Sequence, residues 1–100
     1  MNDPLPELGT VVLSKAGRDA GRYFVVVGKV DDNHVLLSDG NLHKLAKPKK
    51  KKMKHLEVKP VVIPTVREQL TKGTSLYDAE IRRNMEALGY TLKDKALEKL

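Results

Sequence analysis

The fold is decided by residues 9–40, which read GTVVLSKAGRDAGRYFVVVGKVDDNHVLLSDG. Short runs of apolar and β-branched residues alternate here with Gly, Asp and Asn, a pattern typical of short strands joined by tight turns. In the first expected strand, 10–15, Val11 and Leu13 lie on one face, and their neighbours lie on the other. The stretch therefore predicts a mainly β chain.

The longest β-branched run, RYFVVVGKV over 22–30, predicts the central strand. Both of its faces are largely apolar, as expected of a strand that curls around a core. Gly28 is expected to mark a bulge or sharp bend. Because a bulge shifts the alternation of inward and outward side chains by one residue, the pattern does not decide whether Tyr23 or Phe24 points inward. The inward side chains are expected to form a core, with a base-stacking platform as the alternative.

Three further strands are expected. HVLLS over 34–38 is the third, and Asp39-Gly40 predicts a hairpin that leads to a returning strand over 41–46. MKHLEVK over 53–59 is the fifth. The prolines within 60–64 predict an extended linker, so the sheet is expected to end near residue 60.

The rest of the chain is expected to be helical. Ser75 and Asp78 have the spacing of an N-terminal cap, and Gly89 is a typical left-handed stop. We expect the helix after residue 75 to pack onto the sheet through an apolar stripe, which consists of Tyr77, Ile81, Met85 and Leu88. The alternative is that this stripe binds in the groove of a partner. Shorter helical segments are expected over 66–72 and around Leu92, Ala96 and Leu100.

Positive charge is concentrated in the middle of the chain, whose net charge is +6. Residues 15–59 carry twelve Lys or Arg and five acids, whereas residues 1–14 carry two acids and no Lys or Arg, and residues 60–100 carry seven Lys or Arg and six acids. Such clustering is the footprint of a nucleic-acid binder. A merely solvated surface would more often intersperse the two signs.

Most of this charge lies in a lysine-rich loop expected over 44–54, with six lysines in the eight positions 47–54. Self-repulsion and Pro48 predict that the segment is irregular and exposed. Because it lies between two expected strands, it should be held against the sheet as a loop, where it could bind phosphate. The alternatives are a solvated loop or, in a eukaryotic source, a localisation signal.

A second basic segment is GRDAGR, residues 17–22. Gly17 and Gly21 allow a tight turn, because glycine adopts positive φ without steric cost, and Arg18 can then point outward. The alternative is an ordinary hairpin loop with solvated charges.

Other classes of function are poorly supported by the sequence. The chain has no cysteine, which fits a reducing compartment. Its first residues, MNDPLPELG, are acidic and interrupted by proline, so we expect no export leader, and no apolar run approaches the length of about 20 residues that spans a membrane. We therefore expect a soluble, cytoplasmic protein that does not enter a membrane.

Catalytic and metal-binding patterns are also missing. His34, His43 and His55 are too widely spaced for a local metal motif, and no nucleophile elbow or phosphate-cradling glycine loop occurs. We expect no enzyme activity, no metal and no cofactor. His43 and His55 are better explained as hydrogen-bond donors or stacking groups near phosphate.

The segment GTVVLSKAGRDAGRYFVVVGKV resembles the KOW motif, whose central glycine corresponds to Gly21. Its continuation, DDNHVLLSDGNLHKLAKPKKKKMKHLE, resembles small bacterial KOW-domain RNA-binding proteins. These are related to the KOW-containing large-subunit ribosomal protein of the fourteenth eukaryotic-type family, found in archaea and eukaryotes. The resemblance spans about residues 8–56, and it implies a five-stranded SH3-like barrel and RNA binding by the two basic loops.

Together these observations predict a small five-stranded SH3-like (KOW) barrel over 1–60 and a linker with a C-terminal helix, packed on the barrel, over 61–100. The expected function is RNA binding on the ribosome or ribosomal RNA. The expected RNA contacts are Lys15, Arg18, Arg22, Lys44, Lys47, Lys49, Lys50, Lys51, Lys52, Lys54 and His55. The expected structural turn residues are Gly17, Gly21 and Gly40.

The expected partners are ribosomal RNA and ribosomal proteins, and the chain is expected to be a monomer. One alternative is a protein-interaction module that docks on the ribosome or the transcription machinery, which a nuclease-resistant pull-down would favour. The other is an enzyme or metal protein, which stoichiometric metal in the purified protein would support.

Overall fold

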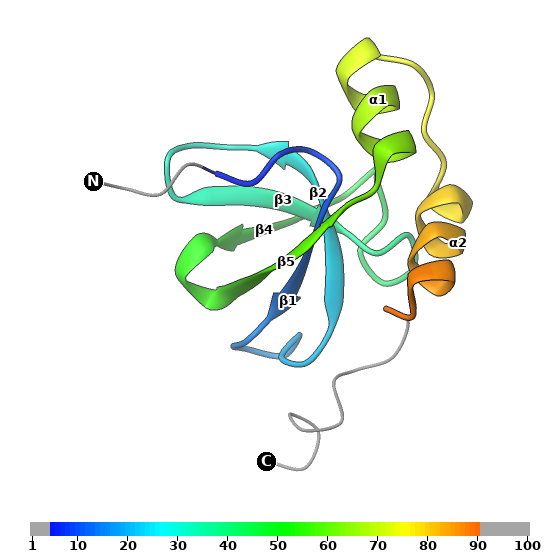
Figure 1. Ribbon diagram of the computed structural model, residues 1–100. Coiled ribbons are helices and arrows are strands. Elements are labelled where there is room, and N and C mark those ends of the chain that lie inside the picture. Colours follow the sequence, from blue (N-terminus) through cyan, green and yellow to red (C-terminus); the bar gives the residue numbers. More distant parts are fainter. Residues whose placement is uncertain (1–4, 91–100) are drawn as a thin grey trace.

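The computed structural model describes residues 5–90 and contains a five-stranded antiparallel sheet with two α-helices to one side of it (Figure 1). The strand order in the sheet is β4-β3-β2-β1-β5. In chain order the elements are β1 (Thr10–Ser14), β2 (Tyr23–Lys29), β3 (His34–Ser38), β4 (Lys49–Lys52), a 3₁₀ turn (Met53–His55), β5 (Leu56–Val62), α1 (Pro64–Lys72) and α2 (Asp78–Leu88). The predictions of a mainly β chain with five strands and a helical C-terminal part are confirmed.

The sheet curls around one cluster of buried side chains. This inner cluster comes from β1, β2, β3 and β5 and consists of Val12, Phe24, Val26, Val35, Leu37 and Leu56. Between Val26 and Gly28 the pairing of β2 with β3 shifts in register, which confirms the bulge expected at Gly28. Within residues 5–90 no ladder joins β4 to β5, so the sheet stays open between its two outer strands.

A second cluster lies on the opposite face of β1 and β2, under the helices. It consists of Val11, Val25, Ile63, Val66, Ile81 and Met85. Neighbouring residues of β1 enter different clusters because successive side chains of a strand point to opposite faces. Phe24 is 1% exposed in the inner cluster, while Tyr23 packs on the helical side with its ring centroid 4.7 Å from that of Tyr90. The inward side chains are therefore core and do not form a stacking platform.

Two predictions for the middle of the chain were wrong. Residues 41–46 form no strand, and the returning strand is β4, which lies inside the expected irregular lysine loop. The reason is local: Asp39 Oδ1 accepts hydrogen bonds from the N–H groups of Asn41 and His43, so the chain folds back on itself after β3. The lysines then pair with the free edge of β3 through their backbone, and the side chains of Lys49, Lys50 and Lys52 are exposed.

The fifth strand begins and ends later than predicted. Residues 53–55 form the 3₁₀ turn, and β5 continues to Val62 through the segment expected to be a linker. Pro60 is tolerated because β5 is an edge strand and Pro60 lies within a shift of register, where Val58 pairs with Val12 and Val62 with Thr10. The absent N–H of proline therefore removes no ladder hydrogen bond.

The two C-terminal helices confirm most of the predicted helix positions and ends, but the predicted N-cap of α2 was wrong. Helix α1 covers the segment expected to be helical over 66–72. The N-cap of α2 is Tyr77, whose N–H donates to Glu80 Oε1 at 3.2 Å, so the cap predicted at Ser75 was placed two residues too early. Gly89 ends α2 with a φ of 82°, as predicted.

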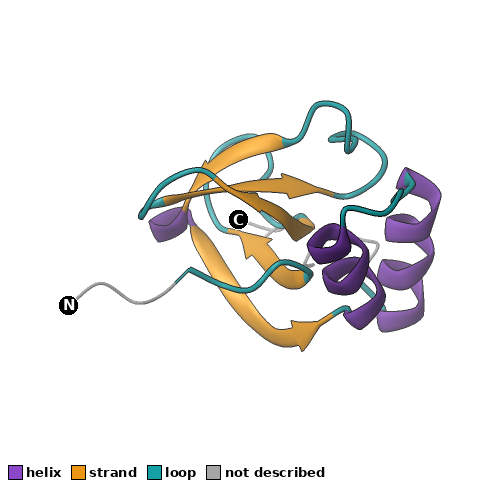
Figure 2. Ribbon diagram, turned by 90° about the horizontal axis from the view of Figure 1, so that it is seen from above, coloured by secondary structure: helices purple, strands orange, loops and turns teal. Residues whose placement is uncertain are grey.

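Only part of the predicted apolar stripe of α2 is buried. Ile81 and Met85 enter the helical-side cluster, whereas Tyr77 and Leu88 are exposed. The expected helical positions Leu92, Ala96 and Leu100 lie outside the described residues. Both views place α1 and α2 together beside one end of the sheet (Figure 2).

Candidate nucleic-acid interface

The four lysines of β4 point alternately to the two sides of the sheet. Lys49 and Lys51 pair with Leu37 and Val35, whose side chains belong to the inner cluster. Lys50 and Lys52 pair with Leu36 and His34 and share the outer side. Directly paired residues lie on the same face of a sheet, so this short strand presents ammonium groups on both sides of its edge.

Lys51 connects the lysine strand to the turn between β1 and β2. Its Nζ donates a hydrogen bond to the carbonyl oxygen of Ala16 at 3.0 Å. Nearby, the backbone N–H of Lys15 donates to the carbonyl oxygen of His55 at 2.8 Å. The two basic segments singled out in the sequence therefore lie side by side, although residues 23–43 separate them in the chain.

The turn over 15–22 is tight because two glycines adopt positive φ, 77° at Gly17 and 88° at Gly21. The N–H of Gly21 donates back to the carbonyl oxygen of Ser14 at 2.8 Å, which closes the turn. Arg18 is exposed at its tip. Asp19 turns away from solvent instead, with its Oδ1 3.3 Å from Nε2 of His43.

The connection from β3 to β4 begins with a compact turn over 39–43. Besides the two hydrogen bonds accepted by Asp39, Ser38 Oγ donates to the carbonyl oxygen of His43 at 2.7 Å and accepts from the N–H of Gly40 at 3.1 Å. Gly40, expected to be a turn residue, has a φ of 73°. Five residues are thus fixed by their own hydrogen bonds, although the segment has no regular secondary structure.

Helix α2 holds the same connection from the other side. Asp78 Oδ1 accepts a hydrogen bond from the N–H of Leu45 at 2.8 Å, and Arg82 Nη1 donates to the carbonyl oxygen of Gly40. A Cβ added to Gly40 would overlap the carbonyl oxygen of Asp78. The helix and the connection are therefore in direct contact at this glycine.

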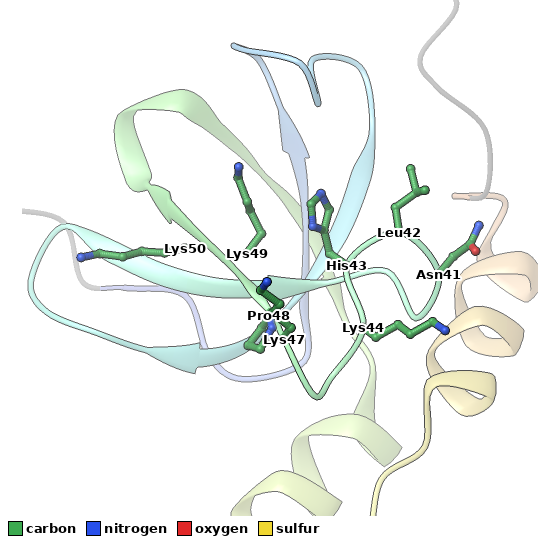
Figure 3. A pocket seen from close by; sticks show the side chains of 8 residues that line it. All are labelled: Asn41, Leu42, His43, Lys44, Lys47, Pro48, Lys49 and Lys50. Carbon is green, nitrogen blue, oxygen red and sulfur yellow. The ribbon is translucent and has the colours of Figure 1, made fainter.

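A pocket of about 630 Å³ lies between this connection and β4, and we call it the 41–50 pocket. It is lined by Asn41, Leu42, His43, Lys44, Lys47, Pro48, Lys49 and Lys50. The side chains of His43 and Lys49 point to the same side, while Lys44 and Lys50 extend in opposite directions (Figure 3). This pocket was not predicted, because residues 41–46 were expected to form a strand.

Sequence similarity to named proteins identifies the family of this chain. No family model matches the chain. It is 32% identical over 88 residues to the large ribosomal subunit protein eL14 of Staphylothermus marinus, covering 88% of this chain and 84% of that protein. It is also 31% identical over 97 residues to eL14 of Pyrobaculum calidifontis, covering 94% of this chain and 86% of that protein. The chain belongs to the eL14 family.

Membership in the eL14 family confirms the resemblance to KOW-containing large-subunit ribosomal proteins. The similarity reaches further than the expected residues 8–56, because an alignment over 97 residues includes both helices. None of the eL14 relatives named here is described as an enzyme.

The predicted contact residues of this eL14-family protein fall into two groups by exposure. Three are half-buried, namely Arg22, Lys51 and His55. The exposed ones are Lys15, Arg18, Lys44, Lys47, Lys49, Lys50, Lys52 and Lys54. The 41–50 pocket brings Lys44, Lys47, Lys49 and Lys50 together, whereas Lys54 and His55 lie on the 3₁₀ turn next to Lys15.

Two side chains outside this set have shifted pKa values. Hydrogen bonds from the N–H of Asn33 and from His34 lower the pKa of Asp31 below 3.8. The hydrogen bond to Glu57 raises the pKa of Lys59 above 10.5. Both groups take part in solvent-facing ion pairs, so these shifts reflect surface pairing.

Two features are absent from residues 5–90, a metal-binding cluster and a membrane-spanning helix. No three His, Asp or Glu side chains gather there into a group that could hold a metal ion. In the same range, neither helix is long and apolar enough to cross a membrane.

Proposed function

We propose that this eL14-family protein binds ribosomal RNA in the large ribosomal subunit, through a basic surface formed by β4, the 3₁₀ turn and the 15–22 turn. The observation that carries the proposal is the hydrogen bond from Lys51 Nζ to the carbonyl oxygen of Ala16. It brings the two basic segments next to each other, which supports one shared RNA-binding surface, and neither segment alone would offer as many cations to one RNA.

The eleven predicted contact residues differ in the kind of contact that they can make with RNA. The exposed lysines contact backbone phosphates as point charges, while the planar guanidinium groups of Arg18 and Arg22 can also fork to phosphate or stack on unpaired bases. Lys51 uses one of its three N–H donors on Ala16, so two remain for RNA. His55 lies beside Lys15 and adds a donor at the edge of the surface.

The scaffold for this surface is proposed to be an SH3-like barrel of the KOW type that ends with β5 at Val62, with the helical segment after it as its extension. The strand order β4-β3-β2-β1-β5 and the curled inner cluster support this. We further propose that the protein acts in the cytoplasm as a monomer and contacts ribosomal proteins as well as RNA.

The test is the salt dependence of RNA affinity, measured by fluorescence anisotropy with labelled single-stranded RNA. If six side chains contact phosphate, the logarithm of the association constant should fall with the logarithm of salt concentration with a slope of about −4. A flat dependence would overturn the proposal. A ribosomal pull-down that survives nuclease treatment, together with a flat slope, would support protein docking instead.

A further inference from the structure

We infer that the 41–50 pocket receives one unpaired nucleotide of the bound RNA, with the base inside and its flanking phosphates on the surrounding lysines. The inference rests on the proposed RNA-binding function and adds to it a class of RNA target, one in which a base leaves the stack as a bulge or loop nucleotide.

The walls of the pocket suit a flat, largely apolar ring with polar edges. Leu42 is 58% exposed, and the ring of Pro48 lies on the same pocket. His43 offers an aromatic ring, and the Asn41 amide can both donate to and accept from a base edge. The remaining four of the eight lining residues are lysines, so apolar and cationic groups lie next to each other. The volume of about 630 Å³ lies within the range of roughly 300–1,000 Å³ that is usual for small-ligand sites.

The charge around the pocket favours a nucleotide within a chain over a free base. The side chains of Lys44 and Lys50 extend in opposite directions from the pocket, and Lys49 points to a third side together with His43 (Figure 3). A nucleotide whose base lies in the pocket would have one phosphate on its 5′ side and another on its 3′ side. Lysines that extend in opposite directions from the pocket could each contact one of these phosphates. A base paired inside an A-form helix cannot enter such a site, whereas an unpaired base can.

The wall of the pocket that His43 forms is held by contacts within the protein. The ring of His43 lies against Phe24, with centroids 5.6 Å apart, and its Nε2 is 3.3 Å from Asp19 Oδ1. The hydrogen bonds of Asp39 and Ser38 hold the backbone on one side. A site that is already ordered loses less conformational entropy on binding, which favours a specific contact over an adaptable one.

The experiment compares three RNA hairpins of the same length and salt conditions. One carries a single unpaired adenosine, the second carries an abasic residue at that position, and the third is fully paired. Stacking of one base is expected to make the first bind on the order of tenfold more tightly than the second. Equal affinity for the base-bearing and abasic hairpins would overturn the inference.

Variants separate the pocket from the general basic surface. Leu42→Ser should remove most of the preference for the unpaired base without altering the salt slope, and its exposed position leaves the fold intact. His43→Ala should do the same, and His43→Gln provides a second variant that retains polar contact near Asp19. Lys54→Ala, outside the pocket, should weaken all three hairpins equally. An equal loss on all three hairpins for Leu42→Ser and His43→Gln would contradict the inference.

Two further results distinguish the possible failures. If none of the hairpins binds at low salt, the proposed RNA-binding function fails, and this inference falls with it. If all bind equally and with a steep salt slope, only the nucleotide pocket is wrong. Adenosine monophosphate serves as the free-nucleotide probe, and binding as tight as that of the bulged hairpin would assign the pocket to a small ligand and overturn the RNA inference.

Discussion

The carboxylate of Asp78, on the first turn of α2, accepts a hydrogen bond at 2.8 Å from the backbone N–H of Leu45, 33 positions earlier in the chain. One helical turn later, Arg82 donates to the carbonyl oxygen of Gly40. The helix thus holds both ends of the segment 40–45, which lines the pocket. The helical extension is therefore joined to the candidate site by specific polar contacts as well as by apolar packing.

Removing the carboxylate of Asp78 should destabilise the protein. Asp78→Ala leaves the N–H of Leu45 without its partner and is expected to lower the free energy of unfolding by about 1–2 kcal/mol, measured by urea denaturation. Asp78→Asn keeps a side-chain acceptor and should lose less. Glu86→Ala, an exposed change on the same helix, is the control. Equal effects of all three changes would contradict a special role for Asp78.

Adding a methyl group at Gly40 should be much more harmful than adding one at Gly73. Both glycines have nearly the same φ, 73° and 72°, so the cost of the left-handed backbone is shared, at about 1–2 kcal/mol. At Gly40 the new Cβ would also overlap the carbonyl oxygen of Asp78, whereas at Gly73 nothing lies within 4 Å. Thermal unfolding of Gly40→Ala and Gly73→Ala should therefore show a lower Tm for the former. Similar Tm values would mean that α2 does not press on Gly40.

Replacing the four lysines of β4 together with alanine should reduce RNA binding and its salt dependence. If four of six phosphate contacts are lost, the slope should change from about −4 to roughly −1.4, and affinity near 0.1 M salt should fall on the order of a hundredfold. The matched control replaces four exposed cations outside the proposed surface and so removes the same number of positive charges, at Lys29, Arg67, Lys72 and Arg83. If the two quadruple variants lose the same affinity, net charge rather than position governs binding.

The turn after β2 should contribute stability that disappears in acid. The pKa of Asp31 is lowered mainly by the hydrogen bond from the N–H of Asn33. The carboxylate of Asp31 therefore binds a proton more tightly in the unfolded chain than in the folded one. The contribution is complete above the unfolded pKa, near 3.8, and is lost as pH falls through the lower folded value. Asp31→Asn keeps the acceptor but removes the charge. The difference in urea midpoint between wild type and Asp31→Asn should shrink as the pH falls below about 4; a difference that stays the same from pH 5 down to about pH 2 would refute this assignment.

Local patterns in the sequence were sufficient to predict the first three strands. Val11, Val25 and Val35 lie in runs whose β-branched residues and flanking turns specify strands without help from distant parts of the chain. The bulge at Gly28 and the end of α2 at Gly89 could also be predicted from the local sequence, because each depends on the backbone freedom of one glycine.

The errors arose where distant contacts decide the structure. Four consecutive lysines have little strand propensity, and β4 exists because β3 offers it a free edge. The carboxylate of Asp78 matched a local cap in the sequence, yet it bonds to Leu45 far away. The pocket could not be predicted, because Leu42 and Pro48 come together only once the expected strand over 41–46 is replaced by a compact turn.

The lysines of β4 have a consequence for the protein before it meets any partner. An open sheet edge is a template on which a second chain can add a strand and begin to aggregate. Here one edge is only four residues long and entirely lysine, so a second copy aligned against it would bring like charges together. The other edge, β5, carries Glu57, Lys59 and Pro60, which oppose the same addition. We therefore expect newly made chains to remain dispersed in solution at high concentration while they await assembly.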